Sequence, residues 1–206
     1  ALFLALERRE TYATSGTRPT VRFFAGHYPA QKCGEADLIA AAYRAGKPMG
    51  GELGPMPGNG SPHFLVWAAK DPGTSTRKGT DLQRAQIIKG WLDAQGNLKE
   101  QVYDVAWSGD RKPGTDGKLP SVGSTVDVAN ATWTNTIGAP ELVAVWKDPD
   151  FDPKEQAFYY TRVIEIPTPR WTAYDAQRFK VQPVPGTMMT VTERAYTSPI
   201  WYTPSS

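Results

Sequence analysis

The segment QIIKGWLDAQGNLKEQVYDVAW, residues 86–107, decides the fold class because it places two strand-like runs on either side of one turn. Residues 86–92 and 101–107 are rich in aromatic and β-branched side chains, which favour a pleated, half-buried surface. Between them stands DAQGN, in which Gly96 and Asn97 can supply the positive φ of a hairpin turn. The segment therefore predicts an antiparallel β-hairpin.

Strand-like runs also lie on both sides of this hairpin. They cover residues 19–24, 63–69, 141–146, 158–166 and part of the C-terminal tail. With the hairpin they make about seven short strands, and the 18 Pro and 19 Gly residues provide the turns between them. The sequence thus predicts a mainly β protein, an antiparallel immunoglobulin-like β-sandwich. Arg162 and Glu165 alternate with aliphatic residues, and we expect both on the outer face of their strand.

Three short helices are expected as additions to the sandwich. Residues 2–10 place apolar side chains on one helical face, residues 35–45 have the helical period and end at a glycine, and residues 171–179 form the third helix. Residues 47–62 are rich in Gly and Pro and predict a long irregular loop.

The composition of the chain argues against nucleic-acid and membrane partners, intrachain disulfides and membrane-spanning helices. The 23 Lys and Arg residues nearly balance 21 Asp and Glu, so the net charge of +2 does not predict nucleic acid or an anionic membrane as the main partner. Cys33 is the single cysteine, so no intrachain disulfide forms and the fold depends on packing. No run approaches the roughly 20 apolar residues that a membrane-spanning helix requires.

Long strings of this sequence resemble the bacterial DUF3604 family. They are ALERRETYATSGTRPTVRFF (residues 5–24), YDVAWSGDRKPG (103–114), TVDVANATWTNTIGAPEL (125–142), DPDFDPKEQAFYYTRVIEIPTPRW (148–171) and ERAYTSPIWY (193–202). Members of this family are similar to PHP-type metal-dependent phosphoesterases, with an α/β domain that bears His and Asp metal ligands and a β-rich region after it. The resemblance implies that this chain corresponds to the C-terminal part of such a protein.

The resemblance also implies a domain boundary within the chain. Residues 1–18 would be the last helix and strand entry of the PHP-like domain, and residues 19–206 would be the C-terminal β-sandwich domain. The divalent metal would belong to the upstream domain, which would be the main partner, and this part of the chain would hold no cofactor and no catalytic residue. A periplasmic or secreted location is a further expectation from the resemblance, and a homo-oligomer is a separate expectation.

Three carboxylates at alternate positions are the most specific candidate for a metal site. Asp148, Asp150 and Asp152 have the spacing with which calcium loops begin, because a hard cation takes several oxygens from one short turn. The pattern has no glycine at its sixth position and no glutamate at its twelfth. A Ca²⁺ loop and a rigid acidic turn capped by Asp side chains both fit this sequence.

Other reactive side chains stand outside any catalytic motif. These are His27, His63, Ser15, Ser108 and Cys33. The two histidines are far apart and lack metal-ligand spacing, and neither serine has the GxSxG context of a hydrolase nucleophile. The basic loop with Arg111, Lys112 and Lys118 is either a solvated loop or an anion contact.

Tryptophans offer an alternative function. Six of them are Trp91, Trp107, Trp133, Trp146, Trp171 and Trp201. Aromatic rings of a β-sandwich can stack on sugar rings, so a carbohydrate- or surface-ligand-binding module is the second reading. Core packing is the simpler interpretation for Trp91, Trp107 and Trp146, which lie inside expected strands. A purely structural or subunit-interface domain is the third reading.

Overall fold

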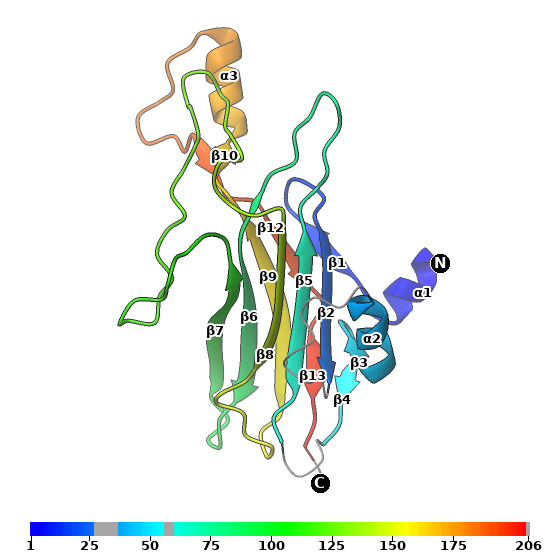
Figure 1. Cartoon of the computed structure of the whole chain (residues 1–206). Coiled ribbons are helices and arrows are strands. Elements are labelled where there is room, and N and C mark those ends of the chain that lie inside the picture. The colour runs from blue at the N-terminus through cyan, green and yellow to red at the C-terminus, as the bar shows by residue number, and fades with distance from the viewer. Residues whose placement is uncertain (27–36, 56–59, 205–206) are drawn as a thin grey trace.

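The strands of the computed structural model, which describes residues 1–26, 37–55 and 60–204, form two main sheets that face one another (Figure 1). The mainly β class is therefore confirmed. The immunoglobulin-like topology stays a prediction, as does the division of the chain at residue 18.

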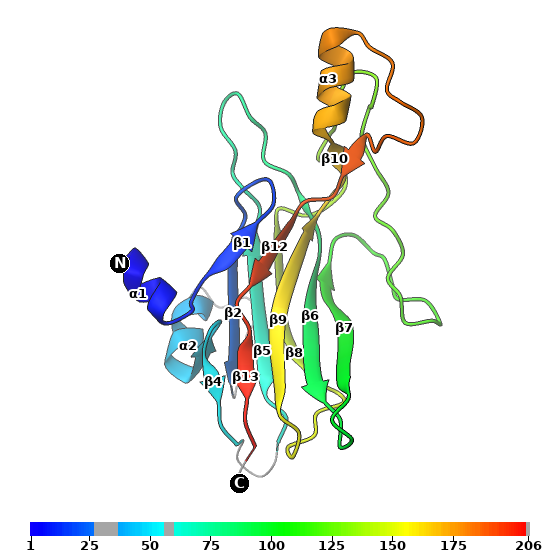
Figure 2. The ribbon, with the colours of Figure 1, turned by 180° about the vertical axis from the view of Figure 1, so that it is seen from behind.

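The larger sheet contains seven strands. They are β1 (Tyr12–Thr14), β4 (Glu52–Leu53), β6 (Leu82–Leu92), β7 (Leu98–Trp107), β9 (Ala157–Glu165), β12 (Arg194–Thr197) and β13 (Ile200–Tyr202). Strand β9 is the centre: β6 pairs with one edge along its length, and β12 and β13 share the other edge end to end (Figure 2). All these pairings are antiparallel except that of β13 with β4, which is parallel and departs from the fully antiparallel expectation.

The second sheet has four antiparallel strands in the order β3-β2-β5-β8. They are β2 (Thr20–Gly26), β3 (Gly46–Pro48), β5 (His63–Ala69) and β8 (Glu141–Lys147). Two short strands, β10 (Thr168–Pro169) and β11 (Thr190–Val191), form a separate antiparallel pair. Strands β3 and β4 occupy part of residues 47–62, so the prediction of one irregular loop there was wrong for the described part of that segment.

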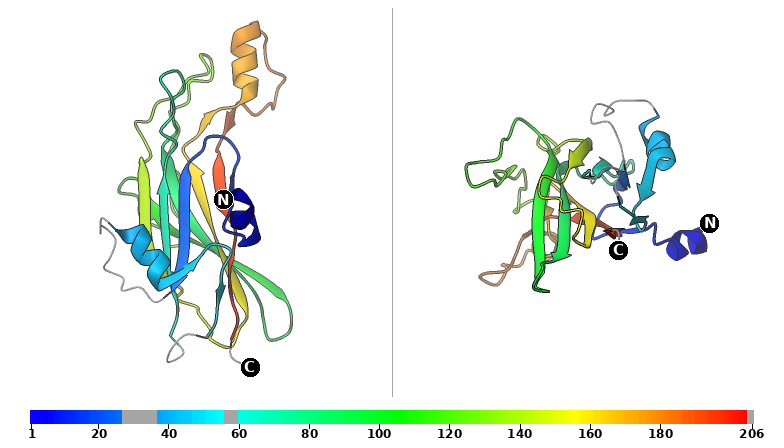
Figure 3. Two further views of the ribbon diagram at one scale, coloured as in Figure 1. Left: turned by 90° about the vertical axis from the view of Figure 1, so that its right-hand side faces the viewer. Right: turned by 90° about the horizontal axis from the view of Figure 1, so that it is seen from below.

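The three helices take different places around the sandwich. They are α1 (Leu2–Glu7), α2 (Leu38–Ala45) and α3 (Trp171–Phe179). Helix α2 lies against the outer face of the four-stranded sheet, where Ala42 packs with Phe24 and Leu65. Helices α1 and α3 extend away from the sheets at different places (Figure 3). In the part of the chain that the structure describes, no helix is long and apolar enough to cross a membrane.

The core lies between the two sheets and is aromatic at its centre. Phe23 and Phe64 of neighbouring strands stack with ring centroids 5.9 Å apart, and Phe64 reaches across to Tyr159 of the other sheet at 4.3 Å. Aliphatic side chains such as Val66 and Ile87 are fully buried around them. Alternation along each strand produces this core, because every second side chain faces the opposite sheet.

The central hairpin is confirmed and is longer than predicted. Strands β6 and β7 pair from Arg84↔Trp107 to Leu92↔Leu98, and Asp93 accepts hydrogen bonds from the backbone N–H groups of Gln95 and Asn97. Gly96 has a φ of 80°, whereas Asn97 is not among the residues with positive φ, so that half of the turn prediction was wrong.

Candidate functional site

A pocket of about 770 Å³ lies at the end of the sandwich that carries α3, and we call it the α3-end pocket. Its walls come from five segments that are far apart in the sequence. They are Gly16 and Thr17; Thr74, Ser75, Thr76, Arg77, Lys78 and Thr80; Ala131, Thr132 and Trp133; Thr168, Pro169, Arg170, Trp171 and Tyr174; and Val191 and Glu193. Figure 1 shows α3, the β1–β2 turn and the loop between β5 and β6 at the end of the sheets opposite the β6–β7 turn.

Local pairing holds these segments in place. Residues 170–189, which carry α3, form what we call the α3 excursion. The pairing of β10 with β11 holds its two ends together, with Thr168 opposite Val191. The segment between β5 and β6 closes on itself through a bridge between Gly73 and Lys78. Gly79 is required there, because an added Cβ would lie 1.7 Å from the carbonyl oxygen of Asp71. The pocket walls are therefore built into the fold.

Three cationic side chains line the pocket, and none of them forms an ion pair with the residues that the structure describes. Arg77 and Lys78 are exposed on the segment before β6. Arg170 precedes α3, and its guanidinium lies 5.3 Å from the centre of the Trp171 ring. Burial raises the pKa of Tyr174, while the nearby charge of Arg77 lowers it, so Arg77 and Tyr174 share the same part of the pocket.

A buried carboxylate lies directly behind the wall. Glu165 is only 2% exposed, and the hydroxyl of Thr17 donates to its Oε1. Burial is the largest effect and raises the pKa of Glu165 to about 7, and the negative charges of Glu193 and Asp71 add to the shift. Its Oε2 is enclosed and has no hydrogen-bond partner among the described residues.

The position of Glu165 shows that the prediction of its strand face was wrong. We expected Arg162 and Glu165 on one outer face, but residues three apart in a strand point to opposite faces. Arg162 is half-buried and donates to Gln86, whereas Glu165 points inward with Val163. A strict count of two along β9 could have found this buried acid.

Trp133 contributes a donor without an acceptor. Its indole Nε1 is enclosed and has no hydrogen-bond partner within residues 1–26, 37–55 and 60–204. Buried polar groups normally have partners, so this enclosed indole N–H is an exception among the described residues. The cations, the aromatic rings and the hydroxyls of the wall suit the binding of a polar ring that carries negative charge.

A comparison with protein-family models shows the family to which the chain belongs. The model described as "Protein of unknown function (DUF3604)" matches residues 1–204. The chain belongs to the DUF3604 family. No curated protein matches this DUF3604 chain, and no solved structure matches it.

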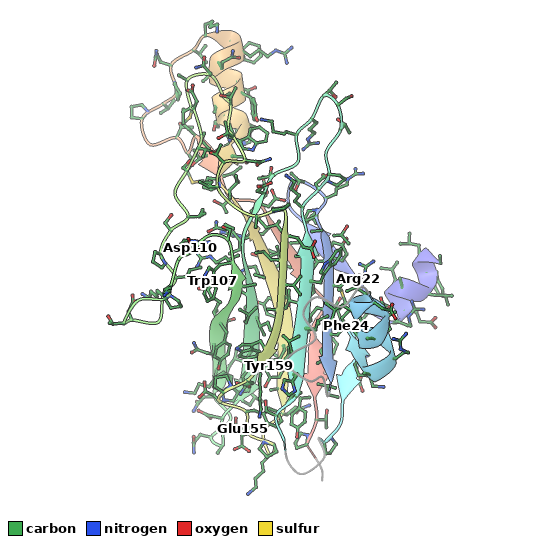
Figure 4. The ribbon with its side chains drawn as sticks, in the orientation of Figure 1. Arg22, Phe24, Trp107, Asp110, Glu155 and Tyr159 are labelled. Carbon is green, nitrogen blue, oxygen red and sulfur yellow. The ribbon has the colours of Figure 1, made fainter. Side chains whose placement is uncertain are left out.

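The acidic turn of the DUF3604 chain lies at the opposite end from the pocket. Glu155 of this turn and Tyr159, which follows it, lie far from α3 in Figure 4. Asp148 is buried; its Oδ2 lies 2.8 Å from Nζ of Lys89 and accepts a 2.7 Å hydrogen bond from the hydroxyl of Tyr159. Asp148 is thus the anion of a buried ion pair.

The other two carboxylates of this turn also accept hydrogen bonds. Asp150 accepts from the hydroxyl of Tyr103 at 3.0 Å, and Asp152 accepts from the backbone N–H of Lys154 at 2.8 Å. Among the described residues there is no group of three or more His, Cys, Asp or Glu side chains arranged to hold a metal ion. The Ca²⁺ loop stays a prediction.

The remaining candidates take structural places in the DUF3604 chain. Ser15 donates to Glu193 beside the pocket, and Ser108 is buried with its hydroxyl directed at the carbonyl of Gln83. His63 begins β5, opposite Lys147 of β8. His27 and Cys33 lie outside the described residues.

The basic loop of residues 111–118 is held in place by one of its own cations. Arg111 donates hydrogen bonds to the backbone carbonyls of Gln83, Ser108 and Pro120, so it holds its loop in place. Lys112 and Lys118 of the same loop are exposed.

The six tryptophans lie in different surroundings. Trp91 and Trp146 pack at the border of the core, and Trp107 is half-buried and donates to the carbonyl of Arg111. Trp201 lies beneath the guanidinium of Arg9, and Trp133 and Trp171 line the pocket. The structure brings together Trp133 and Trp171.

Proposed function

We propose that this chain is an accessory β domain of a PHP-like metal-dependent hydrolase, in which the metal and the hydrolytic chemistry belong to a neighbouring α/β domain. The apolar surface of α1 carries this proposal. Leu2, Phe3 and Leu6 are 77%, 74% and 59% exposed. Apolar patches that stay in water on one helix are typical of surfaces that another domain covers.

The energetics favour such packing. Covering a Leu or Phe side chain completely is worth about 1.5–3 kcal/mol, so the α1 surface can hold a domain contact together. The α3 excursion has a second exposed apolar surface, with Phe179, Val184 and Met188 62%, 75% and 65% exposed.

The connection between the two domains would be short and rigid. In this proposal residues 1–18 complete the PHP-like domain and residues 19–206 form the accessory domain. Strand β1 lies in the first of these segments and pairs with β12, with Tyr12 opposite Thr197. The PHP-like domain is thus the main partner, and a periplasmic or secreted location and a homo-oligomer belong to the same proposal.

The test uses this chain and a PHP-like domain from a DUF3604 protein as separate purified proteins. We expect the chain to show no metal-dependent turnover of a phosphomonoester and to bind the PHP-like domain in sedimentation velocity. Leu2→Glu should abolish the complex. Leu98→Glu is the matched control, because Leu98 is 76% exposed at the hairpin turn, away from α1. Turnover by the chain alone, or equal weakening by both variants, would contradict the proposal.

A second function, a ligand-binding module, is favoured by the α3-end pocket. Its volume of about 770 Å³ lies in the range of small-molecule sites, and its wall mixes aromatic rings with cations and hydroxyls. A panel of small ligands screened by thermal unfolding tests this function. A ligand that raises the Tm of the chain but not that of Trp171→Ala supports it, and a panel without any such ligand contradicts it.

A further inference from the structure

We propose that the α3-end pocket binds an anionic saccharide, a sugar ring that carries a carboxylate or a sulfate. This inference rests on the second function above and specifies its ligand class. The geometry that points to it is the meeting of unpaired cations, aromatic rings and hydroxyls in one pocket wall.

The cations supply the preference for negative charge. Arg77 and Lys78 come from the segment between β5 and β6, and Arg170 comes from the other side, next to α3. No ion pair joins any of the three to the residues described by the structure, so their charges are available to a ligand. Hydrogen bonds from a guanidinium to a carboxylate or sulfate are charge-assisted and are about twice as strong as neutral ones.

The aromatic side chains supply a surface for a sugar ring. Trp171 is 62% exposed and Tyr174 is 43% exposed, although both line the pocket. Large rings that stay in water lose their hydration shell favourably when a ligand covers them. The Arg170 guanidinium lies 5.3 Å from the centre of the Trp171 ring, so a sugar ring on Trp171 would place its anionic group near this cation.

Polar groups of the wall supply hydrogen bonds to sugar hydroxyls. Thr74, Ser75, Thr76 and Thr132 are the exposed hydroxyl-bearing Ser and Thr residues among the described residues of the wall. Among the described lining residues Glu193, which accepts from Ser15, is the one carboxylate, and it can accept from a sugar hydroxyl. The described lining residues thus include three cations and one carboxylate, and this excess of cations favours an anionic over a neutral saccharide.

Isothermal titration of the whole chain with three oligosaccharides tests the inference. The probes are a galacturonate oligomer, a sulfated chondroitin fragment and neutral cellotetraose. We expect at least one anionic probe to bind roughly tenfold more tightly than the neutral one, since each 1.4 kcal/mol is a factor of ten. The affinity should fall as salt is added, because the cations are exposed to solvent. The two anionic probes distinguish a carboxylate site from a sulfate site.

Variants with matched controls assign the binding to the pocket. Arg170→Gln and Trp171→Ala should each weaken binding of the anionic probe by roughly tenfold. The controls are Arg178→Gln and Phe179→Ala on the same helix, where Arg178 lies 5.6 Å from the Phe179 ring and Phe179 is also 62% exposed, outside the pocket wall. Both controls should bind as the unchanged chain does.

Each outcome is decisive. Equal affinity for the neutral and the anionic probes would overturn the anionic class while leaving the ligand-binding function in place. Loss of binding in Arg178→Gln equal to that in Arg170→Gln would overturn the assignment to the pocket. No binding of any of the three saccharides would overturn the inference, and the thermal screen of chemically diverse ligands then decides separately whether the pocket binds at all.

Discussion

The two ends of the sandwich differ in how their cationic side chains are placed: one end has a buried, paired cation, and the other has cations that line a pocket. At the end with the β6–β7 turn, Lys89 and Asp148 are 2% and 0% exposed in their side chains and form an ion pair of 2.8 Å. Nζ of Lys89 also donates to the carbonyl of Asp150 at 2.7 Å, and the ammonium lies 5.0 Å from the Trp91 ring. At the α3 end, the cations of the pocket have no such partners in the described chain.

This difference separates charges that hold the fold together from charges that are available to a ligand. A buried ion needs a partner because its desolvation costs several kcal/mol, so Lys89 and Asp148 depend on each other. Arg77 and Arg170 remain partly hydrated and need none. Glu165 is the intermediate case, since it is buried at the pocket end without a cation beside it and has a raised pKa instead.

Breaking the buried pair should have the largest effect. Asp148→Asn keeps the shape of the side chain but leaves the Lys89 ammonium buried without a counter-charge. We expect the free energy of unfolding to fall by about 3–5 kcal/mol. Urea unfolding followed by tryptophan fluorescence measures it.

The control for this variant is an exposed pair. Asp37 and Arg44 lie 3.0 Å apart with both side chains 66% exposed, so Asp37→Asn should cost less than about 1 kcal/mol. If the two variants unfold at the same urea concentration, the buried pair of Lys89 and Asp148 contributes no more to stability than an exposed pair does.

Glu165 should give the next largest effect, and its sign depends on pH. Its folded pKa of about 7 lies above its ordinary value of 4.5, so its contribution to stability is fully present below pH 4.5 and is lost as the pH rises through 7. One pKa unit corresponds to about 1.4 kcal/mol, which limits the loss at alkaline pH to about 3 kcal/mol.

Glu165→Gln should remove this pH dependence. We expect the variant to unfold at a higher Tm than the unchanged chain at pH 8 and at a similar Tm at pH 4. Thermal unfolding across this pH range measures the effect, and Glu7→Gln on the exposed side of α1 serves as the control. A Tm difference between Glu165→Gln and the unchanged chain that does not vary with pH would show that the carboxylate is hydrated.

The sequence predicts the sandwich better than it predicts the pocket. The hairpin, the strand of residues 63–69 and the helix of residues 171–179 depend on local period and turn residues, and the structure has all three. The pocket depends on five segments that meet only after the sheets have paired. No local pattern encodes such a meeting, so Trp133 and Trp171 stood among six tryptophans without a reason to be joined.

The end with the acidic turn shows a different limit of the sequence. The spacing of Asp148, Asp150 and Asp152 was visible, but the pairing of Asp148 with Lys89 joins residues on strand β6 and on a turn far along the chain. Glu165 was misplaced for a simpler reason, because the period of two was not followed strictly along β9. The pairing of Asp148 with Lys89 depends on tertiary contact, whereas the misplacement of Glu165 arose from local counting.

A smaller effect is expected at the tip of the hairpin. Gly96 has a φ of 80°, and an added Cβ would meet no atom within 4 Å, so Gly96→Ala isolates the cost of backbone conformation. We expect a loss of about 1 kcal/mol in the free energy of unfolding. Gly54→Ala is the control, because its Cβ also meets nothing within 4 Å and its φ is not positive. Equal stabilities of the two variants would mean that the turn relaxes around the new side chain.

Calcium should have the smallest effect, and it tests the predicted loop of Asp148, Asp150 and Asp152. An ion at this turn would have to displace Lys89 from Asp148, and a bound ammonium and a divalent cation cannot share that carboxylate without strong repulsion. We therefore expect millimolar Ca²⁺ to change the free energy of unfolding by less than about 0.5 kcal/mol, whereas a site filled at ten times its Kd would add about 1.4 kcal/mol. Thermal unfolding with Ca²⁺ and with Mg²⁺ at equal ionic strength distinguishes binding from screening. A rise with Ca²⁺ alone that Asp152→Asn abolishes would establish the calcium loop, and it would mean that the end of the sandwich with paired charges also takes a ligand.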